Sequence, residues 1–283
     1  MLAITGATGQ LGQLVIKHLL TKVSANQIVA LVRDIEKAQP LTKLGVEVRL
    51  ADYSQPDALN KALKGVSKLL LISSSEIGQR AEQHRNVIDA AQQNGVSLIA
   101  YTSILKADTS PLALKDEHVE TEQYLKQAKV PYVLLRNGWY TENYLASISA
   151  ALENDGFIGC AKDGRISSAA RDDYAEAAAI ILTSEEPQNG KTYELAGDET
   201  YTLAELCSVI SEESGQTIPY IDMEESEFAS ALESAGLPQP LAAMLANSDT
   251  GASKDGLFDD SHTLSSIIGR KTISLRQLVK HAL

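Results

Sequence analysis

Residues 3–12 read AITGATGQLG, which places Gly6, Gly9 and Gly12 at the spacing G-x-x-G-x-x-G. An apolar run precedes them, and LVIKHLL (residues 14–20), a pattern typical of a helix, follows. In a strand-turn-helix unit that binds a dinucleotide, the first glycine makes the turn, the second lets the backbone approach a pyrophosphate, and the third lets the helix pack closely. The helix N-terminus then favours the phosphate charge. The stretch predicts a dinucleotide-binding loop; a plain turn is the alternative.

Short apolar runs alternate with helical patterns from this loop onward. Near-continuous apolar strands that alternate with helices favour a parallel sheet covered on both faces. We therefore predict an α/β fold with a doubly wound parallel sheet. Its predicted strands are residues 2–5, 28–32, 46–50, 68–73, 98–103 and 132–136.

The pattern loosens after residue 136, where a helix is expected over 140–152. We expect a nucleotide-binding domain over residues 1–155, to which 171–198 returns. Residues 156–170 and 199–283 are expected to form a smaller, mostly helical lobe on the substrate side.

The composition narrows the range of partners. The chain has 283 residues, 44% of them hydrophobic, and a net charge of −12. An acidic surface repels nucleic acid and anionic lipid, and no apolar run is long enough to span a bilayer. Two cysteines, Cys160 and Cys207, are too few for a disulfide framework, and the five histidines show no metal-binding spacing. We expect a cytoplasmic protein without a metal; its oligomeric state stays open.

The end of the second predicted strand bears on the choice of cofactor. The strand IVALV is followed by Arg33, where NAD-binding folds carry an acidic residue for the ribose hydroxyls. A guanidinium at this position can pair with a 2′-phosphate. Arg33 therefore predicts NADPH in preference to NADH, and a solvated arginine is the alternative.

Two further strand ends are expected to face the same crevice. The fourth strand ends in Ser73, Ser74 and Ser75, and the third is followed by Asp52, with Tyr53 beside it. Ligands of open α/β sheets bind beyond the carboxyl ends of the strands. We expect the serines near the cofactor backbone and Asp52 near the adenine; ordinary turn chemistry is the alternative for each.

Several longer motifs carry a resemblance to a known family. The segments GATGQLG, LVRD, LLLISSS, AYTS, HVETE, LLRNGWYTENYL, YELAG and ASKDGLFDDS resemble the NmrA-like group of atypical short-chain dehydrogenases, in particular its branch of bacterial quinone reductases. The resemblance covers essentially the whole chain and implies a Rossmann domain, NADPH and quinone acceptors. With the residues above, the expected cofactor site comprises Gly6, Ala7, Thr8, Gly9, Gln10, Leu11, Gly12, Arg33, Asp52, Ser73, Ser74, Ser75, Asn137, Tyr140 and Asn143.

The chain departs from the usual catalytic pattern of short-chain dehydrogenases, Tyr-x-x-x-Lys. The corresponding segment reads LKDEHVETEQYL, so that His118 takes the place of the lysine and Leu114 that of the tyrosine if Glu122 marks the register. The usual proton relay is therefore absent. No catalytic residue is certain; His118 is the one candidate, as a contact of the nicotinamide ribose. The alternative is a partly exposed helix histidine.

Aromatic residues after the sixth strand are candidates for a substrate pocket. Trp139 and Tyr144 could line it and Phe258 could close it, although a role in the core fits Trp139 and Tyr144 equally well. A triphenylmethane dye reductase branch of the same group shares the first half of the pattern.

The missing tyrosine leaves two classes of function open. One is an NADPH-dependent reductase that transfers hydride directly to a small-molecule quinone. General acid catalysis typically raises a rate by about 10²–10⁴-fold. A reduced quinone needs it less, because it is a phenolate-type anion whose conjugate acid has a pKa of about 10, so that water can protonate it. The alternatives are an NADP(H)-binding redox sensor without turnover, or a reductase of dyes or enones.

Overall fold

The computed structural model describes residues 1–283 and divides into two units. The first unit comprises Met1–Ile104, Asp116–Asn137 and Arg171–Tyr193, and the second comprises Leu105–Lys115, Gly138–Ala170 and Glu194–Leu283.

The first unit is built on a seven-stranded sheet of order β3-β2-β1-β4-β5-β6-β8. Its strands are β1 (Leu2–Ile4), β2 (Ile28–Val32), β3 (Glu47–Leu50), β4 (Lys68–Leu71), β5 (Leu98–Ile104), β6 (Tyr132–Asn137) and β8 (Thr192–Leu195). Strands β1 to β6 pair in parallel, and the strand order reverses between β1 and β4. This is the order of a doubly wound Rossmann fold, as predicted.

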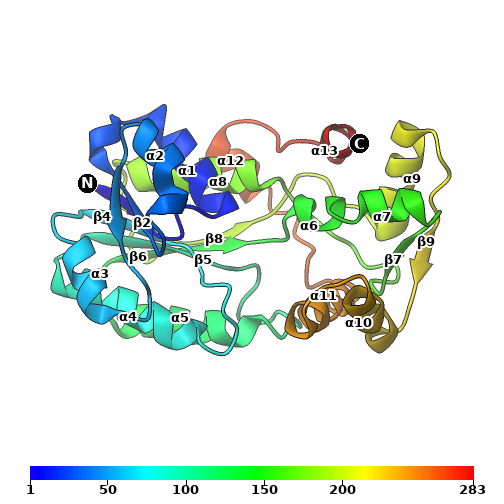
Figure 1. The fold of residues 1–283 in the computed structure, drawn as a ribbon, viewed down its shortest axis with the longest axis horizontal. Coiled ribbons are helices and arrows are strands. Elements are labelled where there is room, and N and C mark those ends of the chain that lie inside the picture. Colours follow the sequence, from blue (N-terminus) through cyan, green and yellow to red (C-terminus); the bar gives the residue numbers. More distant parts are fainter. The chain divides into compact units, whose positions relative to one another are not determined.

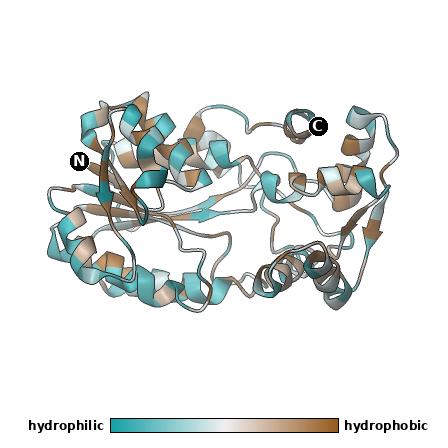
Figure 2. Ribbon diagram, in the orientation of Figure 1, coloured by the Kyte–Doolittle hydropathy of each residue, from teal (hydrophilic) through white to brown (hydrophobic).

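Helices cover both faces of this sheet (Figure 1), with α1 and α8 on one face and α3, α4 and α5 on the other. Their bounds are α1 (Gln10–Leu20), α2 (Gln39–Lys43), α3 (Pro56–Ala62), α4 (Arg80–Gln93), α5 (Lys115–Gln127) and α8 (Arg171–Thr183), with short 3₁₀ turns at Ala25–Gln27 and Glu36–Ala38. In Figure 2 the helices carry both apolar and polar colours, as amphipathic helices do.

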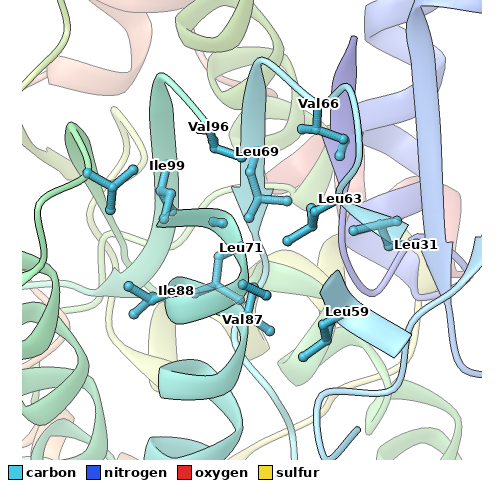
Figure 3. Packing of buried hydrophobic residues seen from close by; sticks show 14 of the residues in the cluster. Leu31, Leu59, Leu63, Val66, Leu69, Leu71, Val87, Ile88, Val96 and Ile99 are labelled. Carbon is cyan, nitrogen blue, oxygen red and sulfur yellow. The ribbon is translucent and has the colours of Figure 1, made fainter. Parts of the chain in front are cut away.

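The inner strands are apolar on both faces because both are covered. On β4, Leu69 and Leu71 pack against Leu59 of α3 and Val87 of α4 in one buried cluster (Figure 3). Leu70, which alternates with them, is also fully buried and points to the other face. Burial of one such side chain stabilises the fold by about 1.5–3 kcal/mol.

The second unit contains the remaining helices and a two-stranded parallel sheet. Its elements are α6 (Thr141–Leu145), α7 (Ile148–Glu153), β7 (Phe157–Gly159), α9 (Leu203–Ser214), β9 (Tyr220–Asp222), α10 (Glu225–Ser234), α11 (Gln239–Ala252), α12 (Thr263–Ile268) and α13 (Leu275–Ala282). None of the helices of the protein is both long enough and apolar enough to cross a bilayer.

The six predicted strands are all present, with ends within two residues of the prediction. The single helix expected over 140–152 is instead the pair α6 and α7. The unit boundary also differs, because residues 138–155 group with the second unit. The reason is visible at α6, where Thr141 shares a hydrogen bond with Ser168 and the Tyr144 hydroxyl donates to Asp249.

Candidate cofactor site

A cavity of about 570 Å³ opens at the carboxyl ends of β1 to β4, where the strand order reverses. This volume lies in the range of small-molecule and cofactor sites. All of its lining belongs to the first unit: Gly6, Thr8, Gly9, Leu31, Val32, Arg33, Asp34, Lys37, Ala51, Asp52, Tyr53, Ile72, Ser73, Ser74, Ser75 and Gln83.

The glycine loop (residues 5–12) forms one wall of the cavity. Gly6 has a φ of +57°, a left-handed conformation that favours glycine, and it accepts a hydrogen bond of 2.9 Å from the Gly9 N–H. A Cβ atom on Gly12 would lie 2.5 Å from the Gly6 carbonyl oxygen and 2.8 Å from Ala7 Cα. The loop is therefore shaped by backbone contacts that only glycine at position 12 permits.

Helix α1 begins within this segment at Gln10, with Gly9 as its N-cap and no side chain capping it. The N–H groups of its first turn are therefore open to a ligand, and the helix dipole favours an anion there. Thr8 and Gly9 line the cavity, and Gln10 is exposed beside them, whereas Ala7 and Leu11 are buried.

Two cations lie at the end of β2. Arg33 lines the cavity with a side chain that is 61% exposed, and Lys37 lines it four residues later. Arg33 forms an ion pair with Glu76, whereas Lys37 lies 3.9 Å from Asp34. The sequence analysis found Arg33 and missed Lys37, whose only signal was a second basic residue shortly after the strand.

Asp52 lies at the end of β3 and also lines the cavity. Its Oδ1 accepts hydrogen bonds from the Ser54 hydroxyl (2.5 Å) and the Ser54 N–H (2.9 Å). These two bonds, with the nearby charge of Arg33, hold the pKa of Asp52 below its usual value, so that the cavity presents a carboxylate here. Tyr53 beside it donates its hydroxyl to the Ile72 carbonyl oxygen (2.9 Å).

A threonine links β1 to β4 where both strands end. The Thr5 hydroxyl donates to the Leu70 carbonyl oxygen (3.2 Å) and accepts from the Ile72 N–H (2.9 Å). Thr5 is fully buried, so these bonds are shielded from water. The glycine loop and the segment after β4 therefore start from one shared contact.

The segment after β4, the serine loop (residues 73–79), forms the opposite wall. The Ser73 N–H donates to the Thr102 hydroxyl (2.9 Å) and the Ser74 N–H to His84 Nε2 (2.9 Å). The Ser74 carbonyl oxygen accepts from Arg80 Nε (2.6 Å). Both polar groups of the Ser74 backbone are thus held by side chains of α4.

A carboxylate from α5 completes this support. Glu117 Oε2 lies 3.2 Å from an Arg80 nitrogen, and its Oε1 accepts from the Gly78 N–H (3.0 Å). The Arg80 side chain is only 6% exposed, and burial strengthens such charge-assisted bonds. Arg80 and Glu117 together fix the serine loop at its two ends.

His84 is fully buried and acts as a neutral hydrogen-bond acceptor. Its Nδ1 lies 2.9 Å from the Thr121 hydroxyl, which donates its own proton to the Glu117 carbonyl oxygen. Nδ1 therefore carries the proton and Nε2 accepts from the Ser74 N–H. Burial, with the charge of Arg80, lowers the pKa of His84 to about 3. His84 and Arg80 were not predicted as site residues, because in the sequence they read as polar positions of a helix.

His118 is also buried, which shows that the alternative of a partly exposed histidine is wrong. Its Nδ1 lies 2.7 Å from the Tyr101 hydroxyl, and burial holds its pKa well below the usual value. Its acidic neighbours have other partners, since Glu117 pairs with Arg80 and Glu122 pairs with Arg136. His118 is not among the residues that line the cavity.

The other predicted site residues are not among the residues that line the cavity. Asn137 is buried at the end of β6, and Tyr140 and Asn143 belong to the second unit. No group of three or more His, Cys, Asp and Glu side chains is arranged to hold a metal ion.

The predicted aromatic pocket residues all belong to the second unit. Trp139 and Tyr144 are buried with their rings 6.4 Å apart, whereas Phe258 lies under Arg165 at 3.9 Å and near Lys106 at 5.4 Å. The structure therefore brings together Trp139 and Tyr144, and their role as a substrate pocket stays a prediction.

The strand order, the glycine loop and the cavity at the switch point define a dinucleotide-binding protein of the Rossmann class. The chain belongs to the NmrA-like family, which it matches over residues 1–278. It is 59% identical over 281 residues to quinone oxidoreductase 2 of Escherichia coli K12, covering 99% of this chain and 98% of that protein.

Two solved structures are similar over the whole chain. The E. coli NADPH-dependent quinone oxidoreductase QOR2 complexed with NADPH has a TM-score of 0.97 at 58% identity, with 99% of each chain covered. Triphenylmethane reductase of Citrobacter sp. complexed with NADP(H) has a TM-score of 0.95 at 40% identity, with 100% of each chain covered.

Proposed function

We propose that this protein is an NADPH-dependent reductase that transfers hydride from the nicotinamide to a small-molecule quinone. The observation that carries the proposal is the pair of cations, Arg33 and Lys37, in a cavity that is also lined by a glycine loop at a helix N-terminus. The 59%-identical relative, quinone oxidoreductase 2 of E. coli, supports a quinone as the acceptor.

The residues present fit the cofactor. The backbone of Gly6 to Leu11 would hold the pyrophosphate against the start of α1. Glycine at position 12 permits this close approach, because a Cβ atom there would collide with the backbone of the turn. Arg33 and Lys37 would hold the 2′-phosphate, and Asp52 would face the adenosine. Ser73 to Ser75 would contact the cofactor backbone.

The nicotinamide half and the acceptor are assigned to later parts of the chain. Asn137, Tyr140 and Asn143 would reach the nicotinamide, and Trp139, Tyr144 and Phe258 the quinone. In this proposal the cavity of the first unit holds the adenosine half of NADPH. The free, buried thiols of Cys160 and Cys207 fit a reducing, cytoplasmic setting.

The protein does not need a proton relay for this reaction. The bound cofactor supplies the hydride. A hydroquinone anion has a conjugate acid with a pKa of about 10, so that water can protonate it. His118 suits no donor role at neutral pH, because burial holds it in the neutral form and its Nδ1 faces Tyr101. The chain's contribution is then to position the two reactants and exclude water.

Absorbance of NADPH followed with a panel of quinones, triphenylmethane dyes, enones and ketones tests this function. We expect turnover above the buffer rate with quinones. Binding of NADPH without turnover on any acceptor would replace the reductase by a redox sensor, and turnover on dyes or enones alone would replace the substrate.

Arg33→Ala tests the assignment of the phosphate site. A charge-assisted hydrogen bond contributes about 1.5–3 kcal/mol, so NADPH affinity should fall by about one to two decades while NADH affinity changes little. Arg85→Ala, at an exposed arginine of α4 outside the cavity, is the matched control. Titration calorimetry measures the affinity for each cofactor. Equal losses of affinity for NADPH and NADH would contradict the assignment of the 2′-phosphate to Arg33.

A further inference from the structure

Arg33, the cation that the proposed function assigns to the 2′-phosphate, is already paired with a carboxylate of the protein. Glu76, in the serine loop, accepts from Arg33 through Oε1 and from the Gln83 amide nitrogen through Oε2 (2.7 Å). Arg33 and Gln83 both line the cavity. Both carboxylate oxygens are therefore committed, one to a cavity cation and one to a cavity amide.

This contact is more than a pair of mobile surface side chains, because Gln83 anchors it from inside. Gln83 is only 5% exposed and projects from the first turns of α4. The backbone of Glu76 is held as well, since its N–H donates to the Ser74 hydroxyl (3.2 Å). Arg33 lines the cavity, so a phosphate that binds Arg33 there meets a guanidinium that is already paired with the Glu76 carboxylate.

We infer that Glu76 is a specificity-determining residue, an internal anion that holds Arg33 in the free protein and that the 2′-phosphate of the cofactor displaces. The inference rests on the proposed function, in which Arg33 binds that phosphate. A phosphate monoester carries about −1.5 to −2 charges at pH 7, so the carboxylate and the phosphate repel each other at one guanidinium. Glu76 therefore weakens NADPH binding and speeds the release of NADP⁺.

The same carboxylate has the opposite effect on a cofactor without a 2′-phosphate. NADH brings no added charge to Arg33, and its adenosine ribose offers a 2′-hydroxyl that a carboxylate can accept, as the acidic residue of NAD-binding folds does. Glu76 thus narrows the preference of the protein for NADPH over NADH.

The test is Glu76→Gln, which keeps the size of the side chain and removes its charge. Calorimetry with adenosine 2′,5′-bisphosphate and 5′-AMP isolates the adenosine half of the cofactor, and NADPH and NADH are measured beside them. We expect the two 2′-phosphorylated ligands to bind about three- to tenfold more tightly. Affinity for 5′-AMP and NADH should stay the same or fall. The gain should shrink as salt is added.

Glu82→Gln is the matched control, because it removes the same charge from an exposed position of α4 that does not line the cavity. An unchanged affinity of Glu76→Gln for the 2′-phosphorylated ligands, or an equal gain for 5′-AMP, would overturn the inference. The phosphate site is judged separately: if Arg33→Ala fails to distinguish adenosine 2′,5′-bisphosphate from 5′-AMP, the proposed function loses its phosphate site. A selective loss in Arg33→Ala without a gain in Glu76→Gln would sink the inference alone.

Discussion

The glycine loop is shaped by its own backbone, whereas the serine loop across the same cavity is held by side chains from α4, α5 and β5. In the first, Gly9 bonds to Gly6 and Gly12 packs against both Gly6 and Ala7. In the second, the support comes from His84, Arg80, Glu117 and Thr102. We therefore expect added atoms to disrupt the glycine loop, and the removal or protonation of the supporting side chains to disrupt the serine loop.

Deletion of the buried cation should have the largest effect on the serine loop. Arg80→Met removes the donor to the Ser74 carbonyl oxygen and leaves the Glu117 carboxylate without its cation. Breaking one side of a buried ion pair costs about 3 kcal/mol or more, and we expect a loss of that order in the free energy of unfolding measured in urea.

Two further variants sharpen this result. Arg85→Met, at an exposed position of the same helix, should cost far less. Arg80→Met combined with Glu117→Gln should recover part of the loss, because the orphaned charge is gone. A loss below about 1 kcal/mol in Arg80→Met would show that the loop is held by its own backbone after all.

Protonation should loosen the serine loop by a smaller amount. The pKa of His84 is lowered to about 3 in the folded protein, against about 6.5 when unfolded. Between these values the unfolded chain binds one proton more, so stability is full above pH 6.5 and falls as the pH falls. For this histidine alone, the loss between pH 7 and pH 5 is about 2 kcal/mol.

His84→Gln isolates this contribution, because the amide oxygen can still accept from the Ser74 N–H but does not titrate. Urea unfolding at pH 7 and pH 5 should show a shallower pH dependence in the variant than in the wild type. The remaining slope includes His118, which is likewise held neutral by burial. An unchanged slope would mean that folding does not lower the pKa of His84.

Addition of one methyl group should have the smallest effect, and its sign tests the glycine loop. Gly12 is in helix α1, where alanine is favoured by about 1 kcal/mol on helix propensity alone. The Cβ would however lie 2.5 Å from the Gly6 carbonyl oxygen, and overpacking costs about 1–3 kcal/mol. We expect Gly12→Ala to lower the midpoint of thermal unfolding and to weaken NADPH binding, with Lys17→Ala on the exposed face as control. A stabilised Gly12→Ala would contradict the close approach.

The same contrast explains which features of the fold and the site could be predicted from the sequence. The strands, the glycine loop and Arg33 could be predicted from local patterns, because an apolar strand, a glycine spacing and a strand end are each contained in a few consecutive residues. Arg80 and His84 were missed because QRAEQHR reads as a solvated helix surface, yet both side chains are buried, and they bond to Glu117 and Thr121 of α5 as well as to the loop that precedes α4. The expectation of a partly exposed His118 failed for the same reason, since only the packing of α5 on β5 buries it.

The domain boundary was less readable than the fold. The predicted first domain ended at residue 155, just after the helix expected over 140–152. The contacts that assign this segment to the second unit join Tyr144 to Asp249 and Thr141 to Ser168. The two residues of each pair are far apart in the sequence, so no local pattern indicates that they are in contact.

The glycine loop and the serine loop begin near one shared hydrogen-bonded residue, Thr5. The amide hydrogen of Ile72 is bonded to the Thr5 hydroxyl, and this hydroxyl is in turn bonded to β4 through Leu70. Exchange of that hydrogen with deuterated solvent therefore requires β1 and β4 to part where both loops begin. The protection of this single amide measures the opening of both walls together, and a ligand that closes either loop slows exchange at a hydrogen that faces Thr5 instead of the cavity.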